Sequence, residues 1–346
     1  MVPVLRERGR AVSTRVFDPL EGEATEQVQA VTEIRFEKWT LADLKAYQPN
    51  QADYVAGRGF LRRGAGTLLG GYTGQGKSVL VEQIAVSVAA GLPILGCIRV
   101  PTPRRVMLLE AENDADTLKR DIESIVDHLG ADRDMVQRNL VIHHAFGISG
   151  PTLNAYLKQE LEKSEADLLI IDPYQSFVGD AEMNSTASFL GWIPWVEAVT
   201  RESRMALLLV AHFGKPSEAR SGWAPGQSVY MTTGTSAISN WARCSAELYP
   251  LKGEGRFRLR FGKNPERTGL IDEHTGATIR DLYLEHSPSK HRPYWIVSED
   301  QSGNETETKA VKVIQARTAN PEWTQQQIAS FVGCSKSYVS ETLKNV

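Results

Sequence analysis

The sequence is poor in cysteine and has no long apolar run. Its three cysteines, Cys97, Cys244 and Cys334, are far apart and odd in number, which excludes a disulfide framework and fits a reduced cytoplasm. No stretch approaches about 18 uncharged apolar residues, so we expect no membrane span. Residues 1–15 carry charges throughout and lack an apolar core, unlike a signal peptide. These absences predict a cytoplasmic protein with no membrane partner.

An excess of basic charge and internal repeats are also missing. The 39 lysines and arginines are outnumbered by 42 aspartates and glutamates, so the formal net charge is −3. This balance excludes a chain-wide basic surface, and any contact with nucleic acid must therefore be local. With 346 residues, 41% of them hydrophobic, the chain can hold one large globular domain and a small one.

A glycine-rich stretch at residues 70–78, Gly-Gly-Tyr-Thr-Gly-Gln-Gly-Lys-Ser, predicts a phosphate-binding loop (P-loop, Walker A). It fits the pattern G-x-x-x-x-G-K-[ST], with a short apolar strand before it and an apolar helix after it. Glycines let several backbone N–H groups point at one anion, and the helix start adds partial positive charge. The residues expected to contact ATP are Gly71, Thr73, Gly74, Gln75, Gly76, Lys77, Ser78 and Val79.

Three side chains are expected to act on the phosphates and their metal ion. Lys77 would reach the terminal phosphates, and the Ser78 hydroxyl would hold Mg²⁺. The stretch Ala166–Asp172 contains four large apolar residues and ends in aspartate. A buried strand that ends in this way delivers a carboxylate to the Mg²⁺ shell, so Asp172 is the second predicted metal ligand.

Apolar runs and helical patterns alternate along the chain. Runs typical of buried strands occur at 66–70, 104–109, 140–143, 166–172 and 206–210. Helices are expected at 79–90, 116–129, 154–163 and 236–244, and around Trp192 and Trp195. Residues 257–261 alternate apolar residues with arginine, as an antiparallel strand does. This order predicts an α/β fold with a mainly parallel sheet, flanked by helices, and antiparallel edge strands.

Changes in composition divide the chain into four segments. They are an N-terminal arm or linker (1–48), the α/β domain (49–285), a polar linker that could hold a strand at 294–297 (286–308), and a small all-α domain (309–346).

The last of these segments has the pattern of a helix-turn-helix. Thr324 and Gln327 form a capping box, Gly333 permits the turn, and Ser335 caps the second helix. Residues 309–346 carry a net charge of +3, from five positive and two negative side chains. The outward side chains able to meet duplex DNA are Lys336, Ser337, Tyr338, Ser340 and Lys344. A three-helix module that docks protein is the alternative.

The motifs and their order resemble the RecA-like ATPases, most closely the hexameric replicative helicases of the plasmid RepA and DnaB type. The resemblance covers roughly residues 50–285. It implies a RecA-like fold and a hexameric ring with Mg²⁺-ATP sites between subunits. It also implies translocation on single-stranded DNA during plasmid or phage replication.

The resemblance assigns roles to residues after two strands. Glu112 matches the catalytic glutamate, the general base that orients and deprotonates the attacking water. Glu110, two residues earlier on the same strand face, is a possible substitute. His212 follows the strand at 206–210 and matches the residue that senses the γ-phosphate.

The family's sites also use cations from the neighbouring subunit. Arg243 matches the arginine finger of the RepA type, Lys263 is a second candidate, and Arg267 is a third. The DnaB-type pattern has its arginine two residues after the lysine, and Pro265 stands there instead.

The loops expected to face the DNA channel are 177–187 and 213–233. The first is acidic and a poor DNA contact. The second interleaves cations with aromatic residues: Lys215, Arg220, Trp223 and Tyr230.

Two other functions remain open at this point. A recombinase or helicase loader would share the ATPase core but act by filament or partner assembly. A DNA-binding regulator, of a different class, would use ATP only as a switch.

Overall fold

The structure is a computed structural model. It describes residues 14–15, 26–27, 38–145, 149–178, 186–213, 236–251, 255–289, 291–298, 313, 316–317 and 320–344. The chain divides into two compact units, residues 1–50 and 51–346. In the first unit, β1 (Thr14–Arg15) pairs with β2 (Glu26–Gln27), and α1 (Leu41–Ala46) begins at a capping box made by Thr40 and Asp43.

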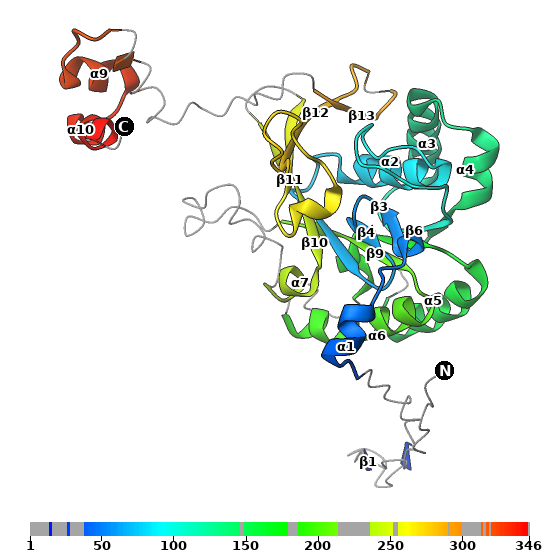
Figure 1. The fold of residues 1–346 in the computed structure, drawn as a ribbon. Coiled ribbons are helices and arrows are strands. Elements are labelled where there is room, and N and C mark those ends of the chain that lie inside the picture. Colours follow the sequence, from blue (N-terminus) through cyan, green and yellow to red (C-terminus); the bar gives the residue numbers. More distant parts are fainter. Residues whose placement is uncertain are drawn as a thin grey trace. The chain divides into compact units, whose positions relative to one another are not determined.

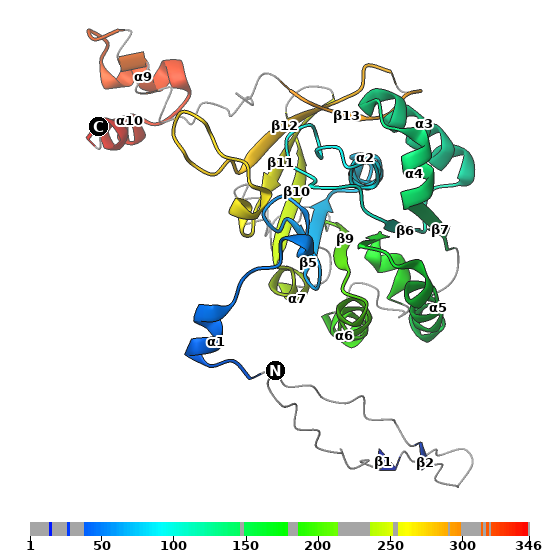
Figure 2. The ribbon, with the colours of Figure 1, turned by 45° about the vertical axis from the view of Figure 1, so that its right-hand side comes forward.

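The second unit is built on a nine-stranded sheet with the order β13-β12-β11-β10-β5-β9-β8-β6-β7 (Figures 1 and 2). The strands are β5 (Gly66–Gly71), β6 (Val106–Glu110), β7 (Leu140–His144), β8 (Leu168–Asp172), β9 (Ala206–His212), β10 (Cys244–Pro250), β11 (Arg256–Phe261), β12 (Asp281–His286) and β13 (Trp295–Val297). Pairing is parallel from β10 to β7 and antiparallel from β10 to β13. The predicted mainly parallel sheet with antiparallel edge strands is confirmed.

Helices cover both faces of this sheet (Figures 1 and 2). One face carries α2 (Lys77–Ala90), with α3 (Ala115–Leu129) and α4 (Arg133–Asn139) packed on it. The other carries α5 (Gly150–Ser164), α6 (Thr186–Glu202) and α7 (Ser236–Trp241). A short hairpin, β3 (Tyr54–Ala56) and β4 (Leu61–Arg62), forms a separate two-stranded sheet.

The alternation of side chains along β8 explains why both faces need helices. Leu168 and Ile170 pack into the core on the α2 side, whereas Leu169 and Ile171 pack into the core with α5 and α6. All four are fully buried. A strand that is apolar on both faces is stable only between two helical layers. Because both faces of β8 are covered, its sequence is an unbroken apolar run.

The structure corrects the prediction for residues 236–244. The helix there, α7, ends at Trp241, and Cys244 begins β10 instead. β10 pairs with β5 on one side and β11 on the other, and Cys244, Ala246 and Leu248 alternate into the α2-side core. Sheet pairing on both sides therefore outweighs the local helical pattern.

The strand expected at 294–297, within the segment 286–308 that is predicted to be a linker, is confirmed as β13. β13 pairs antiparallel with β12 and so extends the sheet as far as Val297. Its first residue, Trp295, is 1% exposed and belongs to the α2-side core.

The C-terminal residues form two helices, α9 (Gln325–Val332) and α10 (Lys336–Lys344). The predicted capping box of Thr324 and Gln327 is confirmed, and Gly333 ends α9 with φ +70°. Ser335 Oγ accepts a hydrogen bond from Tyr338 N at 3.2 Å and so caps α10. The small core of this module contains Val313, Ala316, Ile328, Ala329 and Val339. In the part of the chain that is described, no helix is long and apolar enough to cross a membrane.

Candidate nucleotide-binding site

The ends of four parallel strands bring the predicted site residues together. β5 runs into the P-loop, β6 into the loop that carries Glu112, β8 ends at Asp172, and β9 ends at His212. His212 is level with Gly71 in the β5–β9 pair, and Glu110 is level with Asp172 in the β6–β8 pair. Because parallel strands share one carboxyl edge, residues far apart in the sequence meet there.

Backbone geometry makes glycine necessary within the P-loop. Gly74 and Gly76 have φ values of +78° and +77°, in the left-handed region that favours glycine. A Cβ on Gly76 would also lie 2.9 Å from both His286 Nε2 and Trp295 Cζ2. α2 begins at the next residue, so its unsatisfied N–H groups face the space that the loop encloses.

Lys77 is held at the mouth of this loop. It is 4% exposed, and its Nζ donates a hydrogen bond to the Tyr72 carbonyl at 2.7 Å. Burial lowers the pKa of Lys77 to about 8, although the nearby Asp172 and Glu112 act in the opposite direction. A bound anionic phosphate would raise the pKa of Lys77 again, because an opposite charge stabilises the protonated amine.

Asp172 and Ser78 form an oxygen-rich pair beside Lys77. The Ser78 hydroxyl donates to Asp172, which is 2% exposed and whose Oδ2 is buried without a hydrogen-bond partner among the described residues. Burial, and then the charge of Glu110, raise the pKa of Asp172 to about 7. A cation bound beside this carboxylate would lower its pKa again, because an opposite charge stabilises the ionised form.

These two oxygen donors suit Mg²⁺, which usually takes one or two protein oxygens together with waters and phosphate oxygens. Within the described residues, no group of three His, Cys, Asp or Glu side chains could hold a metal ion by itself. Ser78 and Asp172 would therefore hold Mg²⁺ jointly with the nucleotide.

The two candidate general bases occupy different environments. β6 ends at Glu110, so Glu112 lies in the following turn and not on the same strand face, which corrects the predicted register. Glu110 is 1% exposed, and its Oε1 accepts hydrogen bonds from the backbone N of Glu112 and of Asn113, each at 2.8 Å. Burial raises the pKa of Glu110. Glu110 therefore holds the backbone of the turn that carries Glu112.

Glu112 is the carboxylate that is accessible to a water molecule. Its side chain is 48% exposed, and its Oε1 lies 3.3 Å from His212 Nε2. The hydrogen bond from His212 is the main cause that lowers the pKa of Glu112, so this carboxylate is ionised at neutral pH. An ionised and accessible carboxylate can act as a general base, so the geometry favours Glu112 over Glu110.

The structure shows contacts that brace the P-loop and that the sequence did not predict. The Trp295 indole Nε1 donates to the Gly76 carbonyl at 3.1 Å, across 219 positions of the chain. The backbone of Trp295 also exchanges two hydrogen bonds with the Gln83 side chain on α2, at 2.7 and 3.0 Å. The His286 ring packs on Trp295 and hydrogen-bonds to the backbone of Gln75. A strand was expected near Trp295, but no sequence signal connected it with the P-loop.

Arg243 and Lys263 lie at the opposite edge of the sheet from the P-loop of their own chain. Arg243 N donates to the carbonyl of Gly66, the first residue of β5, at 2.8 Å. Lys263 Nζ donates to the carbonyls of Ser239 and Asn240 at the end of α7, at 3.0 and 3.1 Å. The structure therefore does not bring these two cations to the strand ends that carry the other site residues.

The predicted DNA contacts are described only in part. Lys215 and Arg220, with Trp223, Tyr230 and the greater part of both channel loops, lie outside the described residues. Lys336, Ser337 and Tyr338 are exposed in the first turn of α10, and Lys344 is its last residue.

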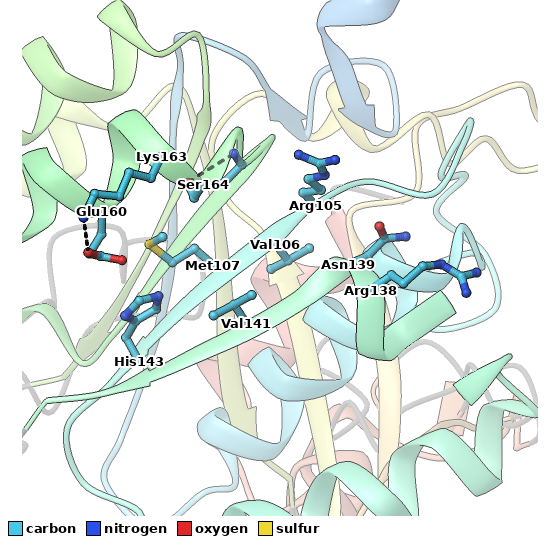
Figure 3. A pocket seen from close by; sticks show the side chains of 11 residues that line it. Arg105, Val106, Met107, Arg138, Asn139, Val141, His143, Glu160, Lys163 and Ser164 are labelled. Carbon is cyan, nitrogen blue, oxygen red and sulfur yellow. Dashed lines mark hydrogen bonds and ion pairs between the residues drawn. The ribbon is translucent and has the colours of Figure 1, made fainter. Parts of the chain in front are cut away.

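A separate cavity of about 340 Å³ lies over β7, the edge strand (Figure 3). It is lined by the amino-terminal half of β6, by β7 and by the end of α5, and it contains none of the nucleotide-site residues. Two of its charged residues, Glu160 and Lys163, pair with each other at 3.4 Å, and Arg105 pairs with Glu165.

Comparison with known proteins finds a family whose model spans the part of the chain that carries this site. A family model described as an AAA domain matches residues 30–218, which is 189 of the 346 residues. The matched range contains the P-loop, Glu112, Asp172 and His212. No curated protein matches the chain.

The geometry predicts that Glu112→Gln stops ATP turnover and leaves ATP binding intact. The amide has nearly the same shape but cannot accept a proton from water, and a general base contributes roughly 10²- to 10⁴-fold to a rate. Steady-state phosphate release measures turnover, and titration with a fluorescent ATP analogue measures binding.

Glu110→Gln is the matched control for this variant. Glutamine keeps an Oε1 that accepts the amides of Glu112 and Asn113, so most of the turnover should remain. If Glu110→Gln stops turnover and Glu112→Gln does not, Glu110 is the base.

The brace predicts that Trp295→Phe weakens ATP binding about fivefold, the equivalent of one net hydrogen bond. Phenylalanine retains most of the packing but removes the indole N–H that reaches the Gly76 carbonyl. The measurement is the dissociation constant of the same ATP analogue, with the melting temperature recorded in parallel.

Trp192→Phe provides the comparison for Trp295→Phe. Trp192 is also buried, at 4% exposure, and its indole nitrogen has no hydrogen-bond partner among the described residues. It should leave ATP affinity unchanged, and equal affinities for the two variants would show that the indole bond does not support the loop.

Proposed function

The chain belongs to the AAA domain family of P-loop ATPases, and we propose that it is an ATP-driven DNA motor of the replicative-helicase kind. In this proposal the chain assembles into a ring, with six subunits as in the helicases it resembles. Each ATP lies between two subunits, and its hydrolysis drives movement along single-stranded DNA in plasmid or phage replication. The observation that carries the proposal is the separation of Arg243 from its own P-loop.

That separation follows from the strand register. Arg243 is bonded to the first residue of β5, whereas the P-loop follows the last residue, Gly71. Five residue steps at about 3.3 Å each put about 17 Å between these two ends. The Arg243 side chain is exposed. It is therefore poorly placed for the ATP of its own chain and open to a site on a neighbouring copy.

Lys263 is better suited to hold Arg243 in place than to reach a phosphate. Its amine caps the carbonyl end of α7, where a cation is favourable. Burial, and then the charges of Arg243 and Arg267, lower the pKa of Lys263. Like charges gathered at one edge are costly in isolation, and an anion from a second subunit would neutralise them.

In the proposed reaction, Glu112 takes a proton from the water that attacks the γ-phosphate, and the bond from the γ-phosphorus to the bridging oxygen breaks to release ADP. Lys77 stabilises the charge that spreads over the phosphoryl oxygens, and Arg243 of the neighbouring subunit does so from the other side. Ser78 and Asp172 would hold Mg²⁺, which would neutralise charge on the phosphates. His212 contacts Glu112 and begins the segment leading to the loop at 213–233, so it is suited to link the γ-phosphate with DNA.

The C-terminal module would bind duplex DNA through α10. Its first turn exposes Lys336 and Tyr338, a cation and an aromatic ring. The same module exposes Phe331 on α9 at 69%, which a protein-docking surface would explain equally well. DNA binding would depend on Lys336 and Tyr338, whereas protein docking would depend on Phe331.

The shared site predicts that Arg243→Ala binds ATP nearly normally but hydrolyses it roughly 10³-fold more slowly, the order expected for an arginine finger. Mixing it with Lys77→Ala should restore part of the activity. An intact P-loop on one chain then meets an intact Arg243 on the next. The measurement is the ATPase rate against mixing ratio after subunit exchange.

A mixture of Lys77→Ala with Glu112→Gln is the control, because both changes lie on the same side of the interface and no complete site can form. If the Arg243→Ala mixture rises no further than this control, the shared site is wrong. That result would favour the alternative function, a monomeric regulator switched by ATP.

The DNA-binding assignment of the module predicts that Lys336→Glu weakens duplex binding and lowers the slope of log affinity against log salt by about one. The ATPase rate without DNA should not change. Phe331→Ser removes the exposed aromatic ring and should leave duplex affinity intact. The opposite pattern would identify the module as a protein-docking surface.

A further inference from the structure

Glu82 is a fully buried acid that the reaction described above does not use. It lies on α2, five residues after Lys77, and is 0% exposed. Burial, and then the charges of Asp121, Glu110 and Asp172, raise the pKa of Glu82 well above its usual range. Burying a carboxyl group costs free energy, and buried ionisable groups with shifted pKa values occur mainly at functional sites.

The hydrogen-bond partner of Glu82 is the residue directly after Glu112. Glu82 Oε1 accepts from Asn113 Nδ2 at 3.4 Å. Asn113 is held at two further points, because its backbone N donates to Glu110 Oε1 at 2.8 Å and its carbonyl contacts His144 Nε2. Bonds to α2, β6 and β7 therefore converge on one residue, and only the bond to Glu82 uses the Asn113 side chain.

Glu82 joins the two parts of the site that must keep a fixed distance. α2 begins with Lys77 and Ser78, which act on the phosphates, whereas the turn after β6 carries the base. A general base works only within hydrogen-bond reach of the water it deprotonates, and a shift of about 1 Å can cost a hundredfold in rate. The Glu110 bonds hold the turn to its own strand but do not connect it to α2.

We propose that Glu82 is a positioning residue for ATP hydrolysis, which fixes Glu112 relative to the phosphates through the Asn113 side chain. The proposal rests on the proposed function only in that this site must hydrolyse ATP. Glu82 touches neither the nucleotide nor the water.

The test is a double-mutant cycle measured as kcat and KM for ATP. Glu82→Ala and Asn113→Ala should each lower kcat by on the order of ten- to a hundredfold, with KM within about twofold of wild type. The double variant should be no slower than the slower single variant, because both changes break the same bond. Glu82→Gln retains the Oε1 acceptor and should restore kcat.

Asp121→Ala is the matched control. Asp121 is another buried acid in the same cluster, but its hydrogen bond goes to Arg120 and not to the turn. It should keep the kcat of the wild type. Melting temperatures identify any variant that fails to fold, and Asn113→Ala, at a partly exposed turn, tests the proposal even if Glu82→Ala does not fold.

The proposal is wrong if Asn113→Ala keeps wild-type kcat, or if the losses of the two single variants multiply in the double variant. Equal losses in Glu82→Ala and Glu82→Gln would likewise overturn it, because the acceptor would then not matter. A wild-type chain that binds ATP without hydrolysing it would overturn the proposed function as well. These results therefore distinguish an error in the proposed role of Glu82 from an error in the proposed ATPase function.

Discussion

The parallel pairing of β5 with β9 and β10 is the constraint on which the rest of the structure depends. Together with the pairing of β8 and β6 beyond β9, it brings the carboxyl ends of the four strands that carry the site residues, β5, β6, β8 and β9, to one edge of the sheet. The phosphate loop, the carboxylates and His212 can act on one small volume only because these strands share a direction. The same register carries Arg243 to the other edge, which is why a second subunit enters the proposed mechanism.

Burial of charge is the second feature of the site. Lys77, Glu110, Asp172 and Glu82 are all at most 4% exposed, and burial is the first cause of each shifted pKa. Buried charges of this kind reduce the stability of a fold and are found mainly where function needs them. Their arrangement is consistent with a site completed by a nucleotide and its cation. Among the acids described at this site, Glu112 is the one that is partly exposed, as the proposed general base has to be.

The hairpin of β12 and β13 gives the P-loop a support that its own flanking elements do not provide. Trp295 and His286 occupy the space against Gly76, so the glycine is required by contact as well as by its φ value. This support comes from the antiparallel edge of the sheet, next to the segment that leads to the C-terminal helices. The edge strands therefore contribute to the site although none of the residues predicted to contact nucleotide lies on them.

The sequence by itself determined the local features of this protein. The P-loop, the strand that ends at Asp172, the apolar helix α2 and the capping box at Thr324 depend on residue type and spacing over a few positions, and the structure has each of them. The tertiary structure alone decided which of Glu110 and Glu112 is exposed, that Cys244 begins a strand, and that Trp295 contacts Gly76. Each of these depends on which residues from distant parts of the chain pack against the position. Local residue spacing does not predict such contacts.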